Sequence, residues 1–380
     1  MRIIMRKKII SLFSVLCSAA ISLSVMLALL LPVLLGSGIS GARPQGEPAS
    51  LMLSDRFHMF MTNSVSNALE GVMDVKKVYW LNDDDLVAPR PNAHLYGTTR
   101  DPGRIAQLLE DAQALLDGQE PVLSPQTPLA PNSDVTYYLD ETIFTATWKQ
   151  TFEDCMYTIS EIKISHPSQF RRFLAGGSYG SGIQLTTTQM ADSVNAVVAS
   201  SGDFFVFRRH GIIVYDGTVQ RVNAEYVDTC YINDDGDLLF SYKGELGDKE
   251  SAQKFVDENN IRFSLAFGPV IMDKGEKIDY HGYALGEVYG NYARSALCQM
   301  GPLHYLLIIC AREGRYDDNT NMRNFQNVIA SFGCDKAYAL DGGQTAVIAM
   351  QGKPINRVSF GYQRQISDII YFATAIPDGE

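Results

Sequence analysis

An uncharged apolar run from residue 9 to residue 35 most limits how this chain of 380 residues can fold. Four basic residues precede the run: Arg2, Arg6, Lys7 and Lys8. It is longer than the roughly 7–15 apolar residues of a signal peptide and fits the roughly 20 that cross a bilayer. Because basic flanks stay on the inner side, we expect residues 1–40 to be a cytoplasmic flank and a single-pass transmembrane signal anchor, with the rest outside. A cleavable signal ending at Ser40-Gly41-Ala42 is the alternative.

The part expected outside the membrane is strongly acidic. The sequence has 32 basic and 43 acidic residues, and four of the basic residues but none of the acidic ones precede residue 41. The remainder therefore carries a net charge of about −15, which opposes nonspecific binding to nucleic acid. We exclude nucleic acid as a partner on this ground. An anionic substrate stays compatible with a site in which a few arginines are concentrated.

Cysteine, histidine and aspartate patterns do not indicate a metal site. Five cysteines follow the apolar run: Cys155, Cys230, Cys298, Cys310 and Cys334. Their odd number and irregular spacing fit neither a disulfide framework nor a zinc site. The six histidines contain no i, i+4 pair, and the Asp-rich turn at residues 233–237 lacks the downstream glutamate of a calcium loop. The sequence therefore predicts no metal and no other cofactor, and a solvated hairpin turn is favoured over a calcium site.

Residues 41–134 are expected to form a linker and a helical stalk region. Apolar residues at helical spacing predict one helix over residues 57–73 and another over residues 101–118. Four prolines between residues 119 and 134 are typical of a connector. We therefore place a domain boundary there, with a separate domain over residues 135–380.

Short runs rich in β-branched and aromatic residues alternate with turns after residue 135. They predict strands over residues 143–148, 156–164, 194–199, 204–207, 212–215, 237–241, 303–311, 337–340 and 345–350. Helical patterns are fewer and cover residues 188–195, 249–259 and 322–332. The order lacks a regular βαβ alternation, so we expect an α+β fold with a mixed, mostly antiparallel sheet and few helices. About 245 residues suffice for one large core.

The segment AYALDGGQTAVIAM, residues 337–350, interrupts two apolar β-type runs with Asp341, Gly342, Gly343, Gln344 and Thr345. A Gly pair between such runs is typical of a hairpin. Glycine also permits positive φ and close approach of the backbone to a ligand, so the same residues are candidates for a binding loop. Spacing alone leaves both interpretations open.

Other polar residues stand at the ends of predicted strands: Asp203, Arg294, Arg315, Asn356 and Arg364. Each of them fits a surface salt bridge. Arginine is also the residue that grips a phosphate with two parallel hydrogen bonds. A carboxylate together with an arginine set is what the cleavage of a phosphate-linked sugar requires.

These blocks, taken in order over residues 154–376, resemble the phosphodiester glycosidase family. The family signature has Leu-Asp-Gly-Gly after an apolar strand, then Asn-x-Gly-Lys, Asn-Arg or Asn-Lys, and a late arginine. Residues 340–345, 351–353, 356–357 and Arg364 take these places here. Upstream, NYARSALCQMGPLHYLLIICAREGR (residues 291–315) and VVASSGDFF (residues 197–205) resemble two further family blocks.

The resemblance implies an extracytoplasmic, membrane-anchored hydrolase that cleaves a sugar-1-phosphodiester in envelope or exopolysaccharide metabolism. Asp341 and Asp203 are then the candidate catalytic residues. The residues implied to bind the sugar-phosphate or polysaccharide substrate are Arg294, Arg315, Gly342, Gly343, Gln344, Thr345, Asn356 and Arg364. Two alternatives are a noncatalytic cell-surface glycan-binding protein of polysaccharide assembly and a structural ectodomain of an envelope complex, docked through the helix at residues 57–73.

Overall fold

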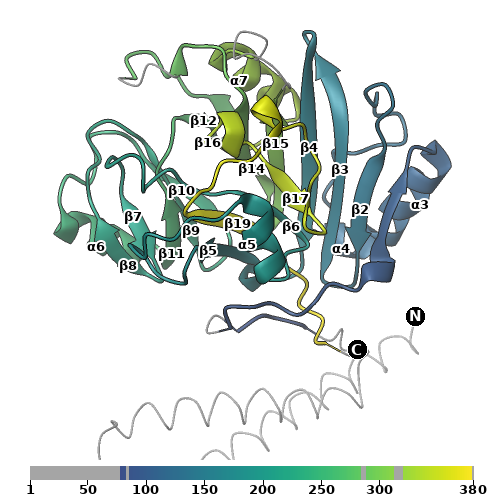
Figure 1. The fold of residues 1–380 in the computed structure, drawn as a ribbon, viewed down its shortest axis with the longest axis horizontal. Helices are drawn as coiled ribbons and strands as arrows, with labels where there is room; N and C mark the ends of the chain where they lie inside the picture. Colours follow the sequence, from purple (N-terminus) through teal and green to yellow (C-terminus); the bar gives the residue numbers. More distant parts are fainter. Residues whose placement is uncertain (1–77, 83–84, 284–287, 312–319, 379–380) are drawn as a thin grey trace, which may run out of the picture. The chain divides into compact units, whose positions relative to one another are not determined.

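Three antiparallel sheets make up the part of the chain that the computed structural model describes, residues 78–82, 85–283, 288–311 and 320–378 (Figure 1). From Val78 onward the chain forms one unit. The predicted membrane anchor and the predicted helix over residues 57–73 lie outside the described residues. Within the described ranges, no helix combines the length and the apolar character needed to cross a bilayer.

The largest sheet has nine strands in the order β1-β2-β3-β4-β15-β14-β16-β12-β13. Their bounds are β1 Tyr96–Thr99, β2 Val135–Leu139, β3 Ile143–Phe152, β4 Cys155–Ile164, β12 Val270–Asp273, β13 Glu276–Lys277, β14 Arg294–Gly301, β15 His304–Cys310 and β16 Lys336–Leu340. Both faces of this sheet are buried: in β15, Leu306 and Ile308 belong to one core, whereas Leu307 and Ile309 belong to another. A strand covered on both faces requires an unbroken apolar run such as HYLLIIC.

Each face of the nine-stranded sheet is covered by a different layer. Three helices, α3 Pro102–Asp111, α4 Gln113–Leu116 and α7 Met322–Ser331, contribute to the core on one face. The other face packs on a five-stranded sheet, β18-β17-β6-β19-β5. Its bounds are β5 Phe170–Leu174, β6 Val198–Ser201, β17 Ile348–Met350, β18 Lys353–Pro354 and β19 Asp368–Phe372. Phe170 of β5 and Phe372 of β19 stack with ring centroids 4.5 Å apart, and both rings contact Tyr305 of β15.

A second five-stranded sheet has the order β10-β9-β11-β7-β8. Its bounds are β7 Ile213–Tyr215, β8 Thr218–Arg221, β9 Thr229–Asn233, β10 Leu238–Ser241 and β11 Ile261–Leu265. Helix α6, Lys249–Glu258, packs on it through Ala252 and Val256. Helix α5, Thr187–Ser193, packs instead on the sheet of β6, β17 and β19. Short 3-10 helices are η1 Ala93–Leu95, η2 Pro167–Gln169, η5 Gly343–Thr345 and η6 Ser359–Gly361.

Mostly antiparallel sheets with few helices confirm the predicted α+β class. The predicted boundary at residue 134 is wrong for the described part of the chain. Strand β1 pairs with β2, so residues before and after the proline-rich connector share one sheet. The backbone N–H groups of Val122 and Leu123 donate to the carboxylate of Glu161 over 2.7 and 2.8 Å. Glu161 is buried in the middle of β4, and the connector supplies the donors that a buried carboxylate requires.

Two local predictions also need correction. Residues 204–207 form a turn rather than a strand, because the N–H groups of Phe207 and Arg208 both donate to the carbonyl of Phe204. The segment after Leu340 is not a hairpin. Strand β16 belongs to the nine-stranded sheet and β17 to a five-stranded sheet, so residues 341–347 carry the chain from one sheet to the other.

Candidate active site

The crossing after β16 brings two predicted site residues to the same place. Ser295 of β14 pairs with Leu340 of β16, so Arg294 and Asp341 stand at the same edge of the nine-stranded sheet. The N–H of Gly343 then donates to the carbonyl of Ala293 over 2.9 Å. This bond attaches the crossing segment to the start of β14.

The two glycines of the crossing meet different requirements. A Cβ on Gly342 would lie 2.1 Å from the carbonyl oxygen of Ala293, so only glycine allows this close approach of two backbones. Gly343 has a φ of +62° and open space around its Cα, so its requirement is conformational. The positive φ that the sequence suggested is found at Gly343, whereas the close approach at Gly342 is to the protein's own backbone, and approach to a ligand stays a prediction.

Asp341 is buried beside two arginines. Arg364 Nη2 lies 2.7 Å from Asp341 Oδ2 in a charge-assisted hydrogen bond. Burial of the carboxyl raises the pKa of Asp341 to about 6, and the nearby charges of Arg364 and Arg208 limit this rise. The group therefore changes its charge close to neutral pH.

An aromatic frame holds these arginines in position. The guanidinium of Arg364 lies 5.1 Å from the ring centroids of both Phe204 and Phe207. The guanidinium of Arg208 lies 5.2 Å from the centroid of Phe204 and 4.7 Å from that of Phe267. Cation–π contacts of this kind fix the planes of the two guanidinium groups without neutralising their charge.

A cavity of about 210 Å³ opens onto Asp341, Gly342, Gly343, Gln344, Arg294 and Arg364. Three buried polar atoms of cavity-lining residues have no hydrogen-bond partner among the described residues: Ser295 Oγ, Gln344 Nε2 and Arg364 Nε. A buried donor left without an acceptor costs about 1–3 kcal/mol. A ligand that brings several acceptor oxygens, as a phosphate does, would supply the missing partners.

Arg294 lines the same cavity but is engaged with the protein. Its Nε donates to the carbonyl of Thr320, and its Nη2 donates to the carbonyls of Val288 and Gly290. Burial lowers the pKa of the Arg294 guanidinium to about 10. Its contacts position the cavity wall, and direct contact with a substrate stays a prediction.

Three other predicted site residues do not line the cavity. The Asp203 carboxylate is buried and accepts from the N–H groups of Phe204 and Ala266. The Thr345 hydroxyl donates to the carbonyl of Gly342, which closes the turn. Asn356 accepts from the N–H of Ile348 and donates to the carbonyls of Ala346 and Arg357, so it clamps the segment around β17. Arg315 lies outside the described residues.

Asp203 belongs to a buried charge cluster rather than to the cavity. Arg172 Nε lies 2.8 Å from Asp368 Oδ2, and Arg172 Nη2 lies 3.7 Å from Asp203 Oδ2. The N–H of Asp203 also donates to the Asp368 carboxylate. Burial raises the pKa of Asp368 to about 6, with Arg172 opposing the rise. The cluster connects Arg172 of β5 and Asp368 of β19 to Asp203, which follows β6 and precedes Phe204 in the sequence.

Sequence reasoning missed Arg208 and its aromatic partners. The run FFVFRRH after Asp203 contains Phe204, Phe207 and Arg208, and the sequence predicts a strand over its first four residues, 204–207. A turn there brings the two phenyl rings together at 5.0 Å and directs Arg208 to Asp341. The density of aromatic and basic residues in seven positions was the signal that pointed to the site.

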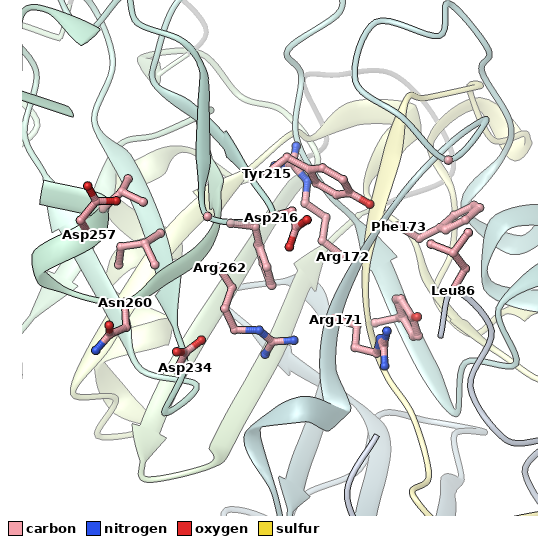
Figure 2. Close-up of a pocket in the computed structure, with 16 residues that line it drawn as sticks. Leu86, Arg171, Arg172, Phe173, Tyr215, Asp216, Asp234, Asp257, Asn260 and Arg262 are labelled. Carbon is pink, nitrogen blue, oxygen red and sulfur yellow. The ribbon is translucent and has the colours of Figure 1, made fainter. Parts of the chain in front are cut away.

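A larger cavity of about 810 Å³ lies elsewhere in the described part (Figure 2). It shares no lining residue with the cavity at Asp341. Its carboxylates, Asp216, Asp234 and Asp257, are all exposed to solvent. We therefore place the candidate active site at Asp341, where a buried carboxylate and the unpartnered donors coincide. The described residues contain no group of three or more potential ligands arranged around a metal position.

Part of the chain matches a known protein family. Residues 194–373, which include Asp341, the aromatic frame and the three arginines that line the cavity, match the family model described as phosphodiester glycosidase. This match is to the family that the motifs resemble. No curated protein matches the sequence.

One solved structure shows a similar fold at low sequence identity. The catalytic domain of zebrafish N-acetylglucosamine-1-phosphodiester alpha-N-acetylglucosaminidase, auto-inhibited by its pro-peptide, is 18% identical, with a TM-score of 0.50 over 79% of this chain and 96% of that one. A hypothetical protein from Synechocystis is 12% identical, with a TM-score of 0.49 over 65% of this chain. The match spans 64% of the length of the Synechocystis protein.

Proposed function

We propose that this chain hydrolyses a sugar-1-phosphodiester at the anomeric carbon. The observation that carries the proposal is the pairing of the buried Asp341 carboxylate with Arg364 in a cavity that also holds unpartnered donors. The match of residues 194–373 to the phosphodiester glycosidase family model supports the same reaction class. The zebrafish enzyme that shares the fold is named for a reaction on an N-acetylglucosamine-1-phosphodiester.

In this mechanism the cavity binds the phosphate group through its arginine and amide donors. Arg364 Nε, Gln344 Nε2 and Ser295 Oγ are the atoms that would donate to the phosphate oxygens. Arg208, held against Phe204 and Phe267, adds positive charge near Asp341. These groups stabilise the negative charge that the phosphate gains as it departs.

Asp341 acts at the sugar side of the scissile bond. The bond between the anomeric carbon and the phosphate oxygen breaks with its electron pair leaving on oxygen, and the ring carbon gains positive charge. The ionised Asp341 carboxylate stabilises that charge. Water then adds its hydroxyl to the anomeric carbon and gives up a proton to solvent, so the products are a free sugar and a phosphate monoester.

One carboxylate in the cavity is sufficient for this chemistry. Ordinary glycosidases need a second carboxyl group to protonate a poor leaving group. A phosphate monoester leaves readily as an anion, and the arginines take over the role of the acid. The Asp203 carboxylate accepts hydrogen bonds from two backbone N–H groups, which is compatible with a structural role for that residue.

We place this reaction outside the cell membrane, in envelope or exopolysaccharide metabolism, with the chain anchored by residues 9–35. The support is the length of the apolar run and its basic flank. Protease added to intact cells should then digest the part from residue 41 to residue 380. Protection of that part in intact cells, with digestion after lysis, would contradict this location.

Hydrolysis in water enriched in ¹⁸O tests the reaction directly. The full-length protein is incubated with methyl phosphodiesters of glucose-1-phosphate and N-acetylglucosamine-1-phosphate, and both products are analysed by mass spectrometry. Cleavage at the anomeric carbon places ¹⁸O in the sugar, whereas an ordinary phosphodiesterase places it in the phosphate. Binding of these diesters without turnover would favour the noncatalytic glycan-binding alternative.

A further inference from the structure

A wide groove lies between the two five-stranded sheets and has no part in the chemistry proposed at Asp341 (Figure 2). Strands β5 and β19 form one wall, and β7 and β11 form the other. The buried Arg172 cluster separates the groove from the active-site cavity, because Arg172 lines the groove and Phe204, next to Asp203, lines the cavity. With a volume of about 810 Å³, the groove falls in the range of about 300–1,000 Å³ typical of sites for small molecules.

Two arginines in the groove are held in place by backbone carbonyls. Arg262 Nη1 donates to the carbonyls of Pro167 and Phe170 over 3.1 and 3.2 Å. Arg171 donates through Nη1 to the carbonyl of Asn82 and through Nη2 to that of Asp85. A guanidinium fixed in this way loses little conformational entropy when a ligand arrives, so its binding geometry is preorganised.

Acceptor groups stand opposite these donors. Figure 2 shows Arg262 in the middle of the groove, with Asp234 and Asp216 on its two sides and Asp257 and Asn260 on the wall beyond. The three aspartates and Asn260 are exposed to solvent. The groove therefore presents both hydrogen-bond donors and hydrogen-bond acceptors to a ligand.

The balance of charge disfavours an anionic ligand. The charge of Arg172 is already compensated by Asp203 and Asp368. Two arginines and three aspartates remain to face the groove, which gives no net positive charge. A phosphate-rich polymer would be repelled by the rim, whereas a neutral polar ligand would not.

We propose that this groove binds a neutral oligosaccharide, as a second site distinct from the cavity at Asp341. Each sugar hydroxyl both donates and accepts a hydrogen bond, so a row of hydroxyls matches the alternation of arginine and aspartate. The half-buried rings of Tyr215 and Phe173 supply apolar faces against which sugar rings pack. Such a site would hold the glycan part of a polymer on the protein whether or not the cavity hydrolyses it.

Binding to hexasaccharides tests the proposal with the full-length chain, purified in a detergent that has no sugar headgroup. Linear hexasaccharides of glucose and of N-acetylglucosamine are the neutral probes, followed by saturation-transfer NMR and calorimetry. Asp257→Ala and Asn260→Gly alter exposed groove residues without disturbing the core, and Tyr215→Ala removes an aromatic face. We expect each change to weaken binding about 10-fold, the size of one well-formed hydrogen bond or stacking contact.

Two controls separate this site from the active site. Glu276→Ala changes an exposed carboxylate on β13, outside the groove, and should leave binding unchanged. Asp341→Asn should also leave hexasaccharide binding unchanged, whatever it does to hydrolysis. Loss of binding in Asp341→Asn with full binding in the groove variants would assign the sugar to the cavity and overturn the proposal. Absence of binding by every probe at about 5 mM, or tighter binding of dextran sulfate than of the neutral chains, would overturn it as well.

Discussion

At the scale of single residues, Asp341 gives the proposed reaction a definite pH dependence. The reaction needs the ionised carboxylate, so kcat/KM should rise as the pH increases through about 6 and level off above it. Asp341→Asn keeps the shape of the side chain and removes its charge. In this variant kcat should fall by roughly 10²–10³, and the step near pH 6 should disappear. Initial rates from about pH 4.5 to about 8.5 measure both effects, and a step that persists in the variant would assign the titration to another group.

Arg364 and Arg294 should respond differently to replacement by lysine. Arg364 pairs with Asp341 and stacks on two phenyl rings, so Arg364→Lys should raise KM about 10-fold or more through loss of the planar fork. Arg294 holds three backbone carbonyls, and Arg294→Lys should lower the free energy of unfolding by about 1–3 kcal/mol. Urea unfolding together with steady-state kinetics separates the two roles. A stable Arg294→Lys protein with a greatly raised KM would return Arg294 to direct phosphate binding.

At the scale of elements, the crossing at residues 341–347 depends more on Gly342 than on Gly343. A Cβ at position 342 would overlap a backbone oxygen that cannot move away without breaking the start of β14. Gly342→Ala should therefore lower the free energy of unfolding by more than the roughly 1–2 kcal/mol expected for Gly343→Ala, where the cost is that of positive φ. Gly343→Asn is the milder comparison, since asparagine tolerates this conformation. Equal losses at both positions, measured by urea unfolding, would contradict the assignment.

Strands were predictable from the sequence because their side chains repeat every two residues or form unbroken apolar runs. HYLLIIC of β15 and KAYAL of β16 are found close to the predicted bounds. The sheet that each strand joins was not predictable from the sequence. Nothing in the residues around Asp341 states that β16 and β17 join different sheets, because that depends on pairing with β14 and β6, far away in the sequence.

The candidate site likewise contains residues that local motifs identify and residues that only tertiary contacts bring together. Motif order identified Asp341, the two glycines, Gln344 and Arg364, which the structure brings to one cavity. The aromatic frame around Arg208 arises from tertiary contacts, since Phe204 and Phe267 lie 63 positions apart in the printed sequence and meet at 6.0 Å. The sequence indicated Asp203 as a candidate catalytic residue because it follows a predicted strand. Its ion-pair partner Arg172, which places it in the buried charge cluster and not in the cavity, comes from β5.

At the scale of the whole molecule, the unit that begins at Val78 should behave as one cooperative structure. The proline-rich connector suggested a break because prolines end regular structure, but Val122 and Leu123 within it donate hydrogen bonds to a buried carboxylate. Glu161 receives two N–H groups from the connector and a third contact from His304 Nε2 at 2.8 Å. A segment that donates the hydrogen bonds required by a buried carboxylate is part of the core, whatever its composition.

A chain shortened to begin at Val135 should therefore fail to fold on its own. The truncation removes β1, two of the three helices that cover one face of the nine-stranded sheet, and the connector, and with them the buried Leu108, Leu116 and Leu123. Each of these buried leucines contributes about 1.5–3 kcal/mol, so together with the two backbone donors lost from Glu161 the loss is comparable to the roughly 5–15 kcal/mol that stabilises a typical domain. A chain that begins at Val78 is the control and should elute as a single species and unfold in one transition. If the shorter chain unfolds with the same midpoint as the longer one, residues 78–134 are an appendage, and the boundary belongs near residue 134 after all.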